Sequence, residues 1–119
     1  MSKINFNEKF ALIVDYWSPA IVGELNGQLV KIAKVKGEFP WHKHEIEDEL
    51  FMVHKGKLTL EFRDRKVVLM PGEMYIIGKG VEHHPMAEEE TEIIMFEPAS
   101  TLNTGNVENE FTKKDLKRI

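Results

Sequence analysis

Two histidines, His42 and His44, are separated by a single residue. If this segment is extended, both imidazoles point to the same face, because strand side chains alternate with a period of two. Glu49 follows a few residues later, and His83 lies much further along the chain. Imidazole and carboxylate groups bind divalent transition metals. These four residues are therefore candidates for a metal site, provided that a curled sheet brings His83 to the other three.

The donor set of this candidate site indicates which metals could bind and how. Three imidazoles and one carboxylate would leave positions of an octahedral metal open to water, dioxygen or a chelating substrate. A structural zinc site is more often closed and rich in thiolate, and this chain has no cysteine. We therefore expect an open site for one divalent transition metal, such as Fe, Mn, Ni or Zn.

Other titratable residues near these four need separate interpretations. Glu47 has the same strand parity as Glu49 and is the alternative carboxylate ligand. His54 and His84 have the opposite parity to Glu49 and His83, respectively, so we expect them on the outside or at the rim of the sheet. Of these two, His84 is the candidate for a residue that supports the site from outside.

The elements that must position these residues are predicted to be strands. Short apolar runs alternate with turn residues at the spacing of an all-β sandwich or barrel. Asn26-Gly27 is the strongest hairpin signal, and no stretch before residue 100 has a useful helical period. The expected strands cover residues 10–17, 20–25, 28–35, 50–54, 58–63, 67–70, 74–77 and 91–96.

The end of the chain has a different pattern. Residues 112–115 resemble a capping box with aspartate in the last position. This predicts one or two helical turns over residues 112–119, as an optional helical tail, while the polar residues 99–110 are expected to form a loop.

Composition limits the protein class. A chain of 119 residues suits one domain with its own core. The absence of cysteine excludes disulfides and fits a reducing compartment. The net charge of −4, without a basic stripe, argues against nucleic-acid and anionic-membrane partners. No apolar run approaches the roughly 20 residues of a membrane span, and the N-terminus lacks the apolar core of a signal peptide. We expect a cytoplasmic protein.

Two stretches of the chain resemble the two conserved motifs of the cupin superfamily. The first motif consists of a glycine, a His-x-His pair, a glutamate and a later glycine, matched by Gly37, His42, His44, Glu49 and Gly56. The second consists of spaced glycines followed by a histidine, matched by Gly72, Gly78, Gly80 and His83. Gly78 and Ala87 stand where the family usually has proline and asparagine. The motifs span residues 37–86, and all four metal-ligand positions match.

The resemblance implies a double-stranded β-helix, the jelly-roll-like cupin barrel, as a single domain over residues 1–119. It also implies that His42, His44, Glu49 and His83 are the metal ligands. A homodimer that pairs or exchanges the N-terminal strand of residues 10–17 is expected on the same ground.

For function, the resemblance implies a metal-dependent enzyme of the dioxygenase or isomerase type, acting on a small oxygen-rich molecule. The alternative is a non-enzymatic module in which the metal helps to hold a small ligand. A metal-stabilised structural domain is a third reading, and it predicts a closed coordination sphere.

A substrate pocket would lie beside the metal. If Glu49 points into the barrel, Phe51 and Val53 share its face, and Trp41 lies beside His42 at the mouth. The same side chains could instead fill the barrel core. The predicted pocket residues are Trp41, Phe51, Val53, Tyr75, Met86 and Phe96.

Overall fold

Strands form nearly all the regular structure of the computed structural model, which describes residues 2–119. In chain order the elements are α1 (Phe6–Phe10), β1 (Ala20–Leu25), β2 (Gln28–Glu38), β3 (Glu49–Lys55), β4 (Leu58–Glu61), β5 (Lys66–Leu69), β6 (Met74–Ile77), β7 (His84–Pro98) and β8 (Lys117–Arg118). Each predicted strand between residues 20 and 96 overlaps one of β1 to β7 and is confirmed, although the last, residues 91–96, covers only the later part of β7. Within residues 2–119, no helix is both long and apolar enough to cross a membrane.

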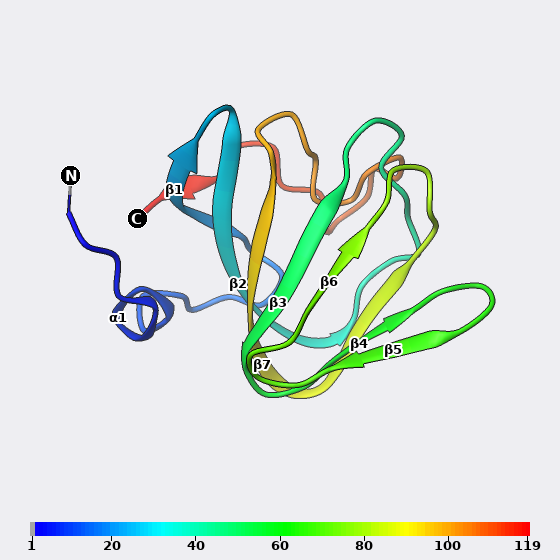
Figure 1. Cartoon of the computed structure of the whole chain (residues 1–119), viewed down its shortest axis with the longest axis horizontal. Helices are drawn as coiled ribbons and strands as arrows, with labels where there is room; N and C mark the ends of the chain where they lie inside the picture. The colour runs from blue at the N-terminus through cyan, green and yellow to red at the C-terminus, as the bar shows by residue number, and fades with distance from the viewer. Residues whose placement is uncertain (1) are drawn as a thin grey trace.

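One long strand, β7, connects the two layers of the molecule. The strand order is β5-β4-β7-β2-β1-β8, and β3 pairs with both β7 and β6. The first residues of β7 pair with β4, whereas its later residues pair with β3, and both parts pair with β2. Figure 1 shows β7 curving from the β4 side to the β2 and β3 side. The predicted double-stranded β-helix is therefore confirmed.

Glycines shape two of the turns. Asn26 and Gly27 have φ values of 50° and 78°, as a two-residue turn between β1 and β2 requires, so the predicted hairpin is confirmed. Gly56, with φ of 97°, lies where the chain passes from β3 to β4. A Cβ at Gly56 would lie 2.5 Å from Thr91 Oγ1, so only glycine fits against β7 at this point.

Alternation along the strands sends one set of side chains into the space between the layers. Glu49, Phe51 and Val53 are all buried on β3, and Leu58, Leu60 and Phe62 are buried along and just after β4. Both patterns were predicted from the sequence. The inward apolar residues pack into one cluster that contributes most of the hydrophobic stabilisation.

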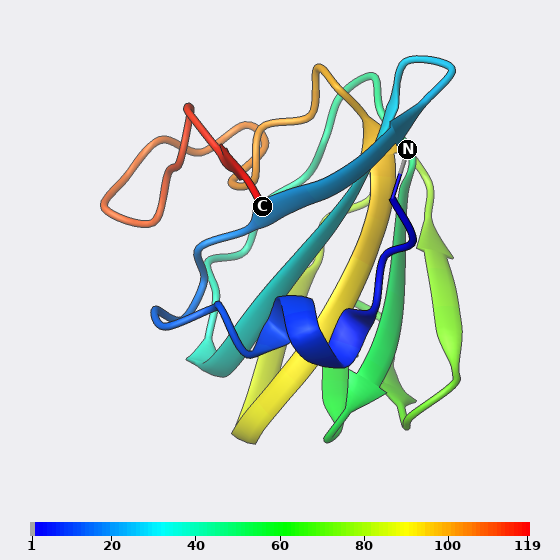
Figure 2. The ribbon, with the colours of Figure 1, turned by 90° about the vertical axis from the view of Figure 1, so that its left-hand side faces the viewer.

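The N-terminal segment differs from the prediction. Residues 10–17 are not a strand; Phe6–Phe10 is the short helix α1, in which the Asn5 side chain caps the Glu8 amide at 3.0 Å. Figure 2 shows α1 lying across the outer face of the sheet, where Phe10 packs with Ile32 and Ile94. Phe6, Phe10 and Ile13 are spaced i, i+4 and i+7, which is a helical period. The apolar run that starts at Phe10 suggested a strand instead.

The predicted helix over residues 112–119 is also wrong. The Thr112 hydroxyl accepts the Asn109 amide at 3.0 Å, so it closes the preceding turn instead of starting a helix. Lys117–Arg118 then forms β8, parallel to β1, and the Ile119 amide donates to Ile21 O at 3.0 Å. Residues 99–110 contain no helix or strand, as predicted.

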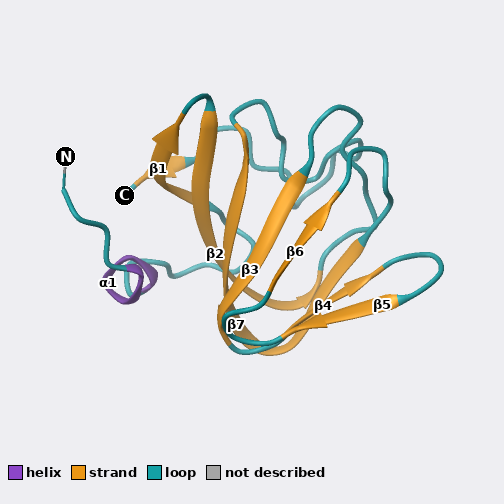
Figure 3. Cartoon of the chain, viewed as in Figure 1, coloured by secondary structure: helices purple, strands orange, loops and turns teal. Residues whose placement is uncertain are grey.

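Loops gather at one end of the molecule. Figure 3 shows the β2–β3 and β6–β7 connections and the segment after β7 near one another at the open end of the layers. Three of the four candidate ligands lie in the first two of these loops.

Candidate metal centre

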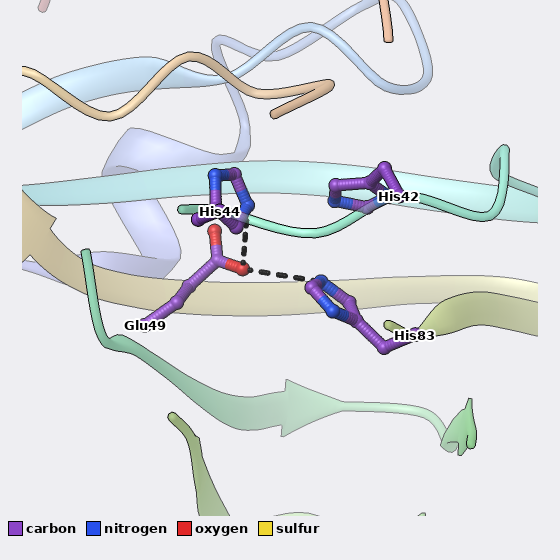
Figure 4. A group of neighbouring side chains, drawn as sticks. All are labelled: His42, His44, Glu49 and His83. Atoms are coloured by element: carbon purple, nitrogen blue, oxygen red, sulfur yellow. Dashed lines mark ion pairs between the residues drawn. The ribbon is translucent and has the colours of Figure 1, made fainter. Parts of the chain in front are cut away.

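Four buried side chains converge at this end of the interior. The ligand atoms of His42, His44, Glu49 and His83 all lie within 4.8 Å of one another. Each residue is at most 3% exposed. Figure 4 shows the Glu49 carboxylate facing the imidazoles of His44 and His83, with His42 beside these two rings. The structure thus brings together all four residues that the sequence singled out.

Backbone pairing holds two of these residues side by side. The His42 amide donates to His83 O at 3.1 Å, and the His83 amide donates to His42 O at 2.9 Å. This isolated antiparallel bridge joins the β2–β3 loop to the residue that precedes β7. Glu49 enters from the first position of β3. The cluster is therefore assembled by sheet register rather than by one continuous segment.

A second backbone contact fixes the histidine loop from outside. The Lys43 amide donates to the Asn106 side chain, and the Asn106 amide donates to Lys43 O, both at 2.9 Å. A Cβ at Gly105 would lie only 2.2 Å from Lys43 O. Residues 105–106 therefore clasp the segment between His42 and His44, and the clasp requires glycine.

Hydrogen bonds to backbone carbonyls orient two of the rings. His42 Nδ1 lies 2.8 Å from Pro40 O, and His83 Nδ1 lies 2.9 Å from Val81 O. A ring that donates from Nδ1 keeps the lone pair on Nε2, which is the arrangement typical of metal-ligating histidines. Both rings are thus set up to offer Nε2 to a shared centre.

Several polar atoms at the centre lack a partner. His44 Nδ1 and Nε2, Glu49 Oε1 and His83 Nε2 are buried without a hydrogen bond. Glu49 Oε1 lies 3.3 Å from His44 Nε2 and 3.5 Å from His83 Nε2. Buried polar groups are normally paired, and unpaired ones are costly. A cation among these atoms would satisfy them together, so the residues fit a divalent metal.

The pKa values favour the metal-binding protonation states. Burial, reinforced by the nearby His83, lowers the pKa of His42 to about 4. Burial by itself raises the pKa of Glu49, but the adjacent imidazoles of His44 and His83 outweigh it and hold that pKa well below its usual range. Neutral imidazole and ionised carboxylate are the forms that coordinate metals.

A buried ion pair that the sequence reasoning missed lies beside the cluster. Lys31 Nζ is 3.0 Å from Glu97 Oε1, and both side chains are 2% exposed. Burial and the adjacent Glu49 carboxyl raise the pKa of Glu97, whereas Lys31 acts in the opposite direction. The signal was the inward parity of each residue, which follows the buried apolar alternation of β2 and β7.

A narrow cavity opens next to these groups. The cavity has a volume of about 40 Å³. Its wall is largely apolar, with polar groups contributed by His42, Glu49, Glu97 and Asn103. The aromatic residues in the wall are Trp17, Phe39 and Phe51. Of the six predicted pocket residues, Phe51 lies in this wall.

The other five predicted pocket residues lie elsewhere, for reasons of parity and packing. Phe96 pairs with Leu50 and lies outside the wall of this cavity, whereas its neighbours Met95 and Glu97 line it. Val53 faces inward, but it packs in the core cluster away from the cavity wall. Met86 is half-buried opposite Glu38 and Thr59.

The two remaining aromatic residues of the predicted pocket, Tyr75 and Trp41, also lie outside the wall of this cavity. Tyr75 packs against Phe62 outside the cavity, and its hydroxyl contacts Arg65. Trp41 stacks on His84 with ring centroids 5.2 Å apart, and the Arg63 guanidinium lies 3.7 Å from the Trp41 ring centroid. Trp41 therefore clamps the loop to the second layer rather than lining the cavity.

The excluded titratable residues have partners of their own. His54 faces outward, with Nε2 2.9 Å from Asn7 Oδ1. His84 Nε2 lies 3.1 Å from Glu38 Oε1, and His84 Nδ1 lies 3.0 Å from Glu61 Oε1. Glu47 lies outside the cluster and accepts the Ser100 hydroxyl at 2.8 Å. His84 is more buried than its parity suggested, because Trp41 covers it.

The chain is similar to known proteins along most of its length. A family model described as a cupin domain matches residues 28–97. A crystal structure of a cupin-2 domain containing protein from Shewanella frigidimarina is 52% identical, with a TM-score of 0.79, over 80% of this chain and 93% of that one. Protein NMB1881 from Neisseria meningitidis is 27% identical, with a TM-score of 0.76, over 82% of this chain and all of the other.

A curated relative matches part of the chain. Protein YdbB from Bacillus subtilis (strain 168) is 38% identical over 63 residues. The match covers 52% of this chain and 56% of YdbB, so it extends over little more than half of that relative.

Proposed function

The chain belongs to the cupin domain family, and we propose that His42, His44, Glu49 and His83 bind one divalent transition metal, such as Fe, Mn, Ni or Zn. The observation that carries this proposal is the set of four converging ligand atoms, buried and partly without hydrogen-bond partners. The neutral imidazole of His42 and the ionised carboxylate of Glu49 supply lone pairs without prior deprotonation.

The metal site would serve an enzyme of the dioxygenase or isomerase type, acting on a small oxygen-rich molecule. A bound metal supplies a Lewis acid or a site for dioxygen. The chain itself contributes the remaining functions: His42 and His83 are oriented by backbone carbonyls, Glu49 adds negative charge, and the apolar cavity wall excludes water from the ligand. The small volume of the cavity supports a small substrate.

The alternative is a binding module in which the metal helps to hold a ligand that is not converted. The same cluster and cavity support this reading. Turnover assays with metal-loaded protein on phenols, diketones, flavonoids and sugar phosphates separate the two. Product formation supports the enzyme, and saturable ligand binding without product supports the module.

Metal binding is tested with the full chain. We expect metal analysis of the purified protein to find close to one equivalent of a divalent metal, and titration calorimetry with Zn²⁺ or Mn²⁺ to saturate at the same ratio. His83→Ala should abolish this binding. The matched control is His54→Ala, which removes an outward-facing imidazole from the same sheet. Absence of bound metal, together with no uptake by the wild type, contradicts the proposal.

Assembly and location form a further part of the proposal. We propose one cupin domain over residues 1–119, supported by the pairing of β8 with β1. A homodimer remains proposed, but residues 10–17 offer no strand for exchange; the more than half-exposed Met74 and Ile76 on the outer face of edge strand β6 support an apolar contact instead. A monomer mass by light scattering contradicts the dimer.

A cytoplasmic location fits a chain without cysteine.

A further inference from the structure

One carboxyl group in the wall of the cavity has an oxygen without a hydrogen-bond partner. Glu97 is 2% exposed, and its Oε1 is held by Lys31 at 3.0 Å. Its second oxygen, Oε2, is buried and has no hydrogen-bond donor among residues 2–119. Glu97 belongs to the cavity wall. A ligand that reaches this carboxyl would therefore satisfy a group that is otherwise left unpaired.

The position of Glu97 relates this group to the candidate metal centre. Its carboxyl group contacts that of Glu49, and both residues line the cavity. Trp17, Phe39 and Phe51 supply flat apolar surfaces in the same wall. A molecule in the cavity would thus meet an apolar wall, a polar end at Glu97 and the metal-binding cluster at once.

We infer that the cavity binds a small single-ring compound whose hydroxyl group is hydrogen-bonded to Glu97, which makes Glu97 a specificity-determining residue. This inference rests on the proposed function, because it names the ligand class of the same site. A hydroxyl both donates and accepts, so it matches the Glu97 carboxyl in either protonation state. The flat aromatic side chains in the wall, Trp17, Phe39 and Phe51, suit a planar ring.

The surrounding charges disfavour other groups at this position. A carboxylate would be placed against two carboxyl groups, Glu49 and Glu97, where like charges repel. An ammonium group would compete with Lys31, which already holds Glu97, and would lose its hydration in an apolar cavity. A neutral hydroxyl avoids both penalties.

The test compares two probes of matched size, phenol and toluene, which differ by a hydroxyl in place of a methyl group. Their dissociation constants are measured by titration calorimetry on the Zn²⁺-loaded full chain, and the toluene-to-phenol ratio is compared between variants. We expect this ratio to fall about tenfold or more in Glu97→Met. Glu97→Gln should retain the wild-type ratio, because an amide also donates and accepts.

Controls separate this inference from effects on folding and on the metal. Glu88→Met alters an exposed glutamate on the same strand and should leave the ratio unchanged. Lys31→Met/Glu97→Met removes the whole buried pair without leaving an unpaired ammonium, so it replaces Glu97→Met if that variant fails to fold.

The outcomes distinguish the two proposals. Two outcomes overturn the inference and leave the metal proposal intact. In the first, the folded Glu97→Met variant binds Zn²⁺ and has the wild-type toluene-to-phenol ratio. In the second, the wild type binds Zn²⁺ but does not bind phenol. A variant that loses Zn²⁺ binding and keeps its phenol-to-toluene preference also overturns it. If the wild type binds no metal, the same ratio is measured on metal-free protein, and a preference that depends on Glu97 upholds the inference while the metal proposal fails.

Discussion

The five histidines of this chain fall into two groups that differ in the direction their side chains face. His42, His44 and His83 face the interior, whereas His54 and His84 face outward. His83 and His84 are adjacent, yet one belongs to the candidate metal centre and the other does not. The comparison of these two neighbours separates two kinds of buried histidine.

The difference between the groups lies in their partners rather than in burial. His84 is 7% exposed, but carboxylates occupy both of its ring nitrogens and Trp41 covers its face. Among the inner residues, His44 has two ring nitrogens without a hydrogen bond and His83 has one. Unpaired buried nitrogens, and not buried histidines as such, identify the atoms available to a metal.

The largest expected effect comes from removing one member of each group. His44→Ala should weaken Zn²⁺ binding about 1000-fold, because a direct ligand contributes more than the 10- to 100-fold typical of supporting residues. His84→Ala should weaken it by about tenfold at most. Competition with a chromophoric chelator measures both affinities. Equal losses in the two variants would remove the distinction between the groups.

The second prediction concerns the pH dependence of the metal-free protein. The unfolded chain takes up a proton on His42 near pH 6.5, whereas the folded chain resists this until about pH 4. Stability from this group is therefore complete above pH 6.5 and decreases as the pH falls to about 4, by at most about 3 kcal/mol.

Urea unfolding from pH 7 to pH 4 measures this effect. His42→Gln should show a shallower loss of stability across the window than the wild type. The outer His54→Ala should retain the wild-type slope. Parallel profiles for His42→Gln and the wild type would mean that His42 is not protected from protonation in the fold.

A smaller effect is expected on the outer face. His54 stacks on Phe10 with ring centroids 5.2 Å apart and contacts Asn7. His54→Ala should destabilise the fold by about 1 kcal/mol and loosen α1, with Zn²⁺ affinity unchanged. Thermal unfolding and amide exchange in residues 6–10 test this. A loss of metal affinity instead would show that α1 supports the site through the sheet.

The smallest effect is expected at the Trp41 clamp. Arg63 is exposed above the Trp41 ring, so Arg63→Gln should cost about 0.5 kcal/mol. Zn²⁺ affinity should stay within about twofold, because Trp41 keeps its stack on His84. Thermal unfolding and the chelator assay measure both values. A larger affinity loss would mean that the clamp orients His42.

Regular alternation and turn chemistry made most of the sheet predictable. Asn26-Gly27 and the alternation of Leu58, Leu60 and Phe62 each matched a strand or turn in the structure. The candidate ligands were recognised because their spacing matched both the period of a strand and the cupin motifs. The four ligands come close together because β7 pairs with strands of both layers. No local sequence pattern indicates this pairing.

The errors occurred where tertiary contacts override local pattern. Phe10 begins an apolar run that resembles a strand, but the outer face of the sheet selects the helical set formed with Phe6 and Ile13. Thr112 resembles a helix cap, but its hydroxyl oxygen accepts a hydrogen bond from the Asn109 amide in the preceding turn. Phe96 was assigned to the pocket because its parity was unknown until the register with Leu50 was seen.

The clasp between Lys43 and residues 105–106 has a consequence for the order of events during synthesis. All four candidate ligands leave the ribosome before Gly105 and Asn106 do. A nascent chain that ends between these points can pair His42 with His83, but its histidine loop still lacks its outer backbone partners. Fixing of the histidine loop therefore depends on residues beyond the 28–97 segment. A truncated cupin core of this chain would keep the ligands and the His42–His83 bridge, but it would lack the outer clasp on the histidine loop.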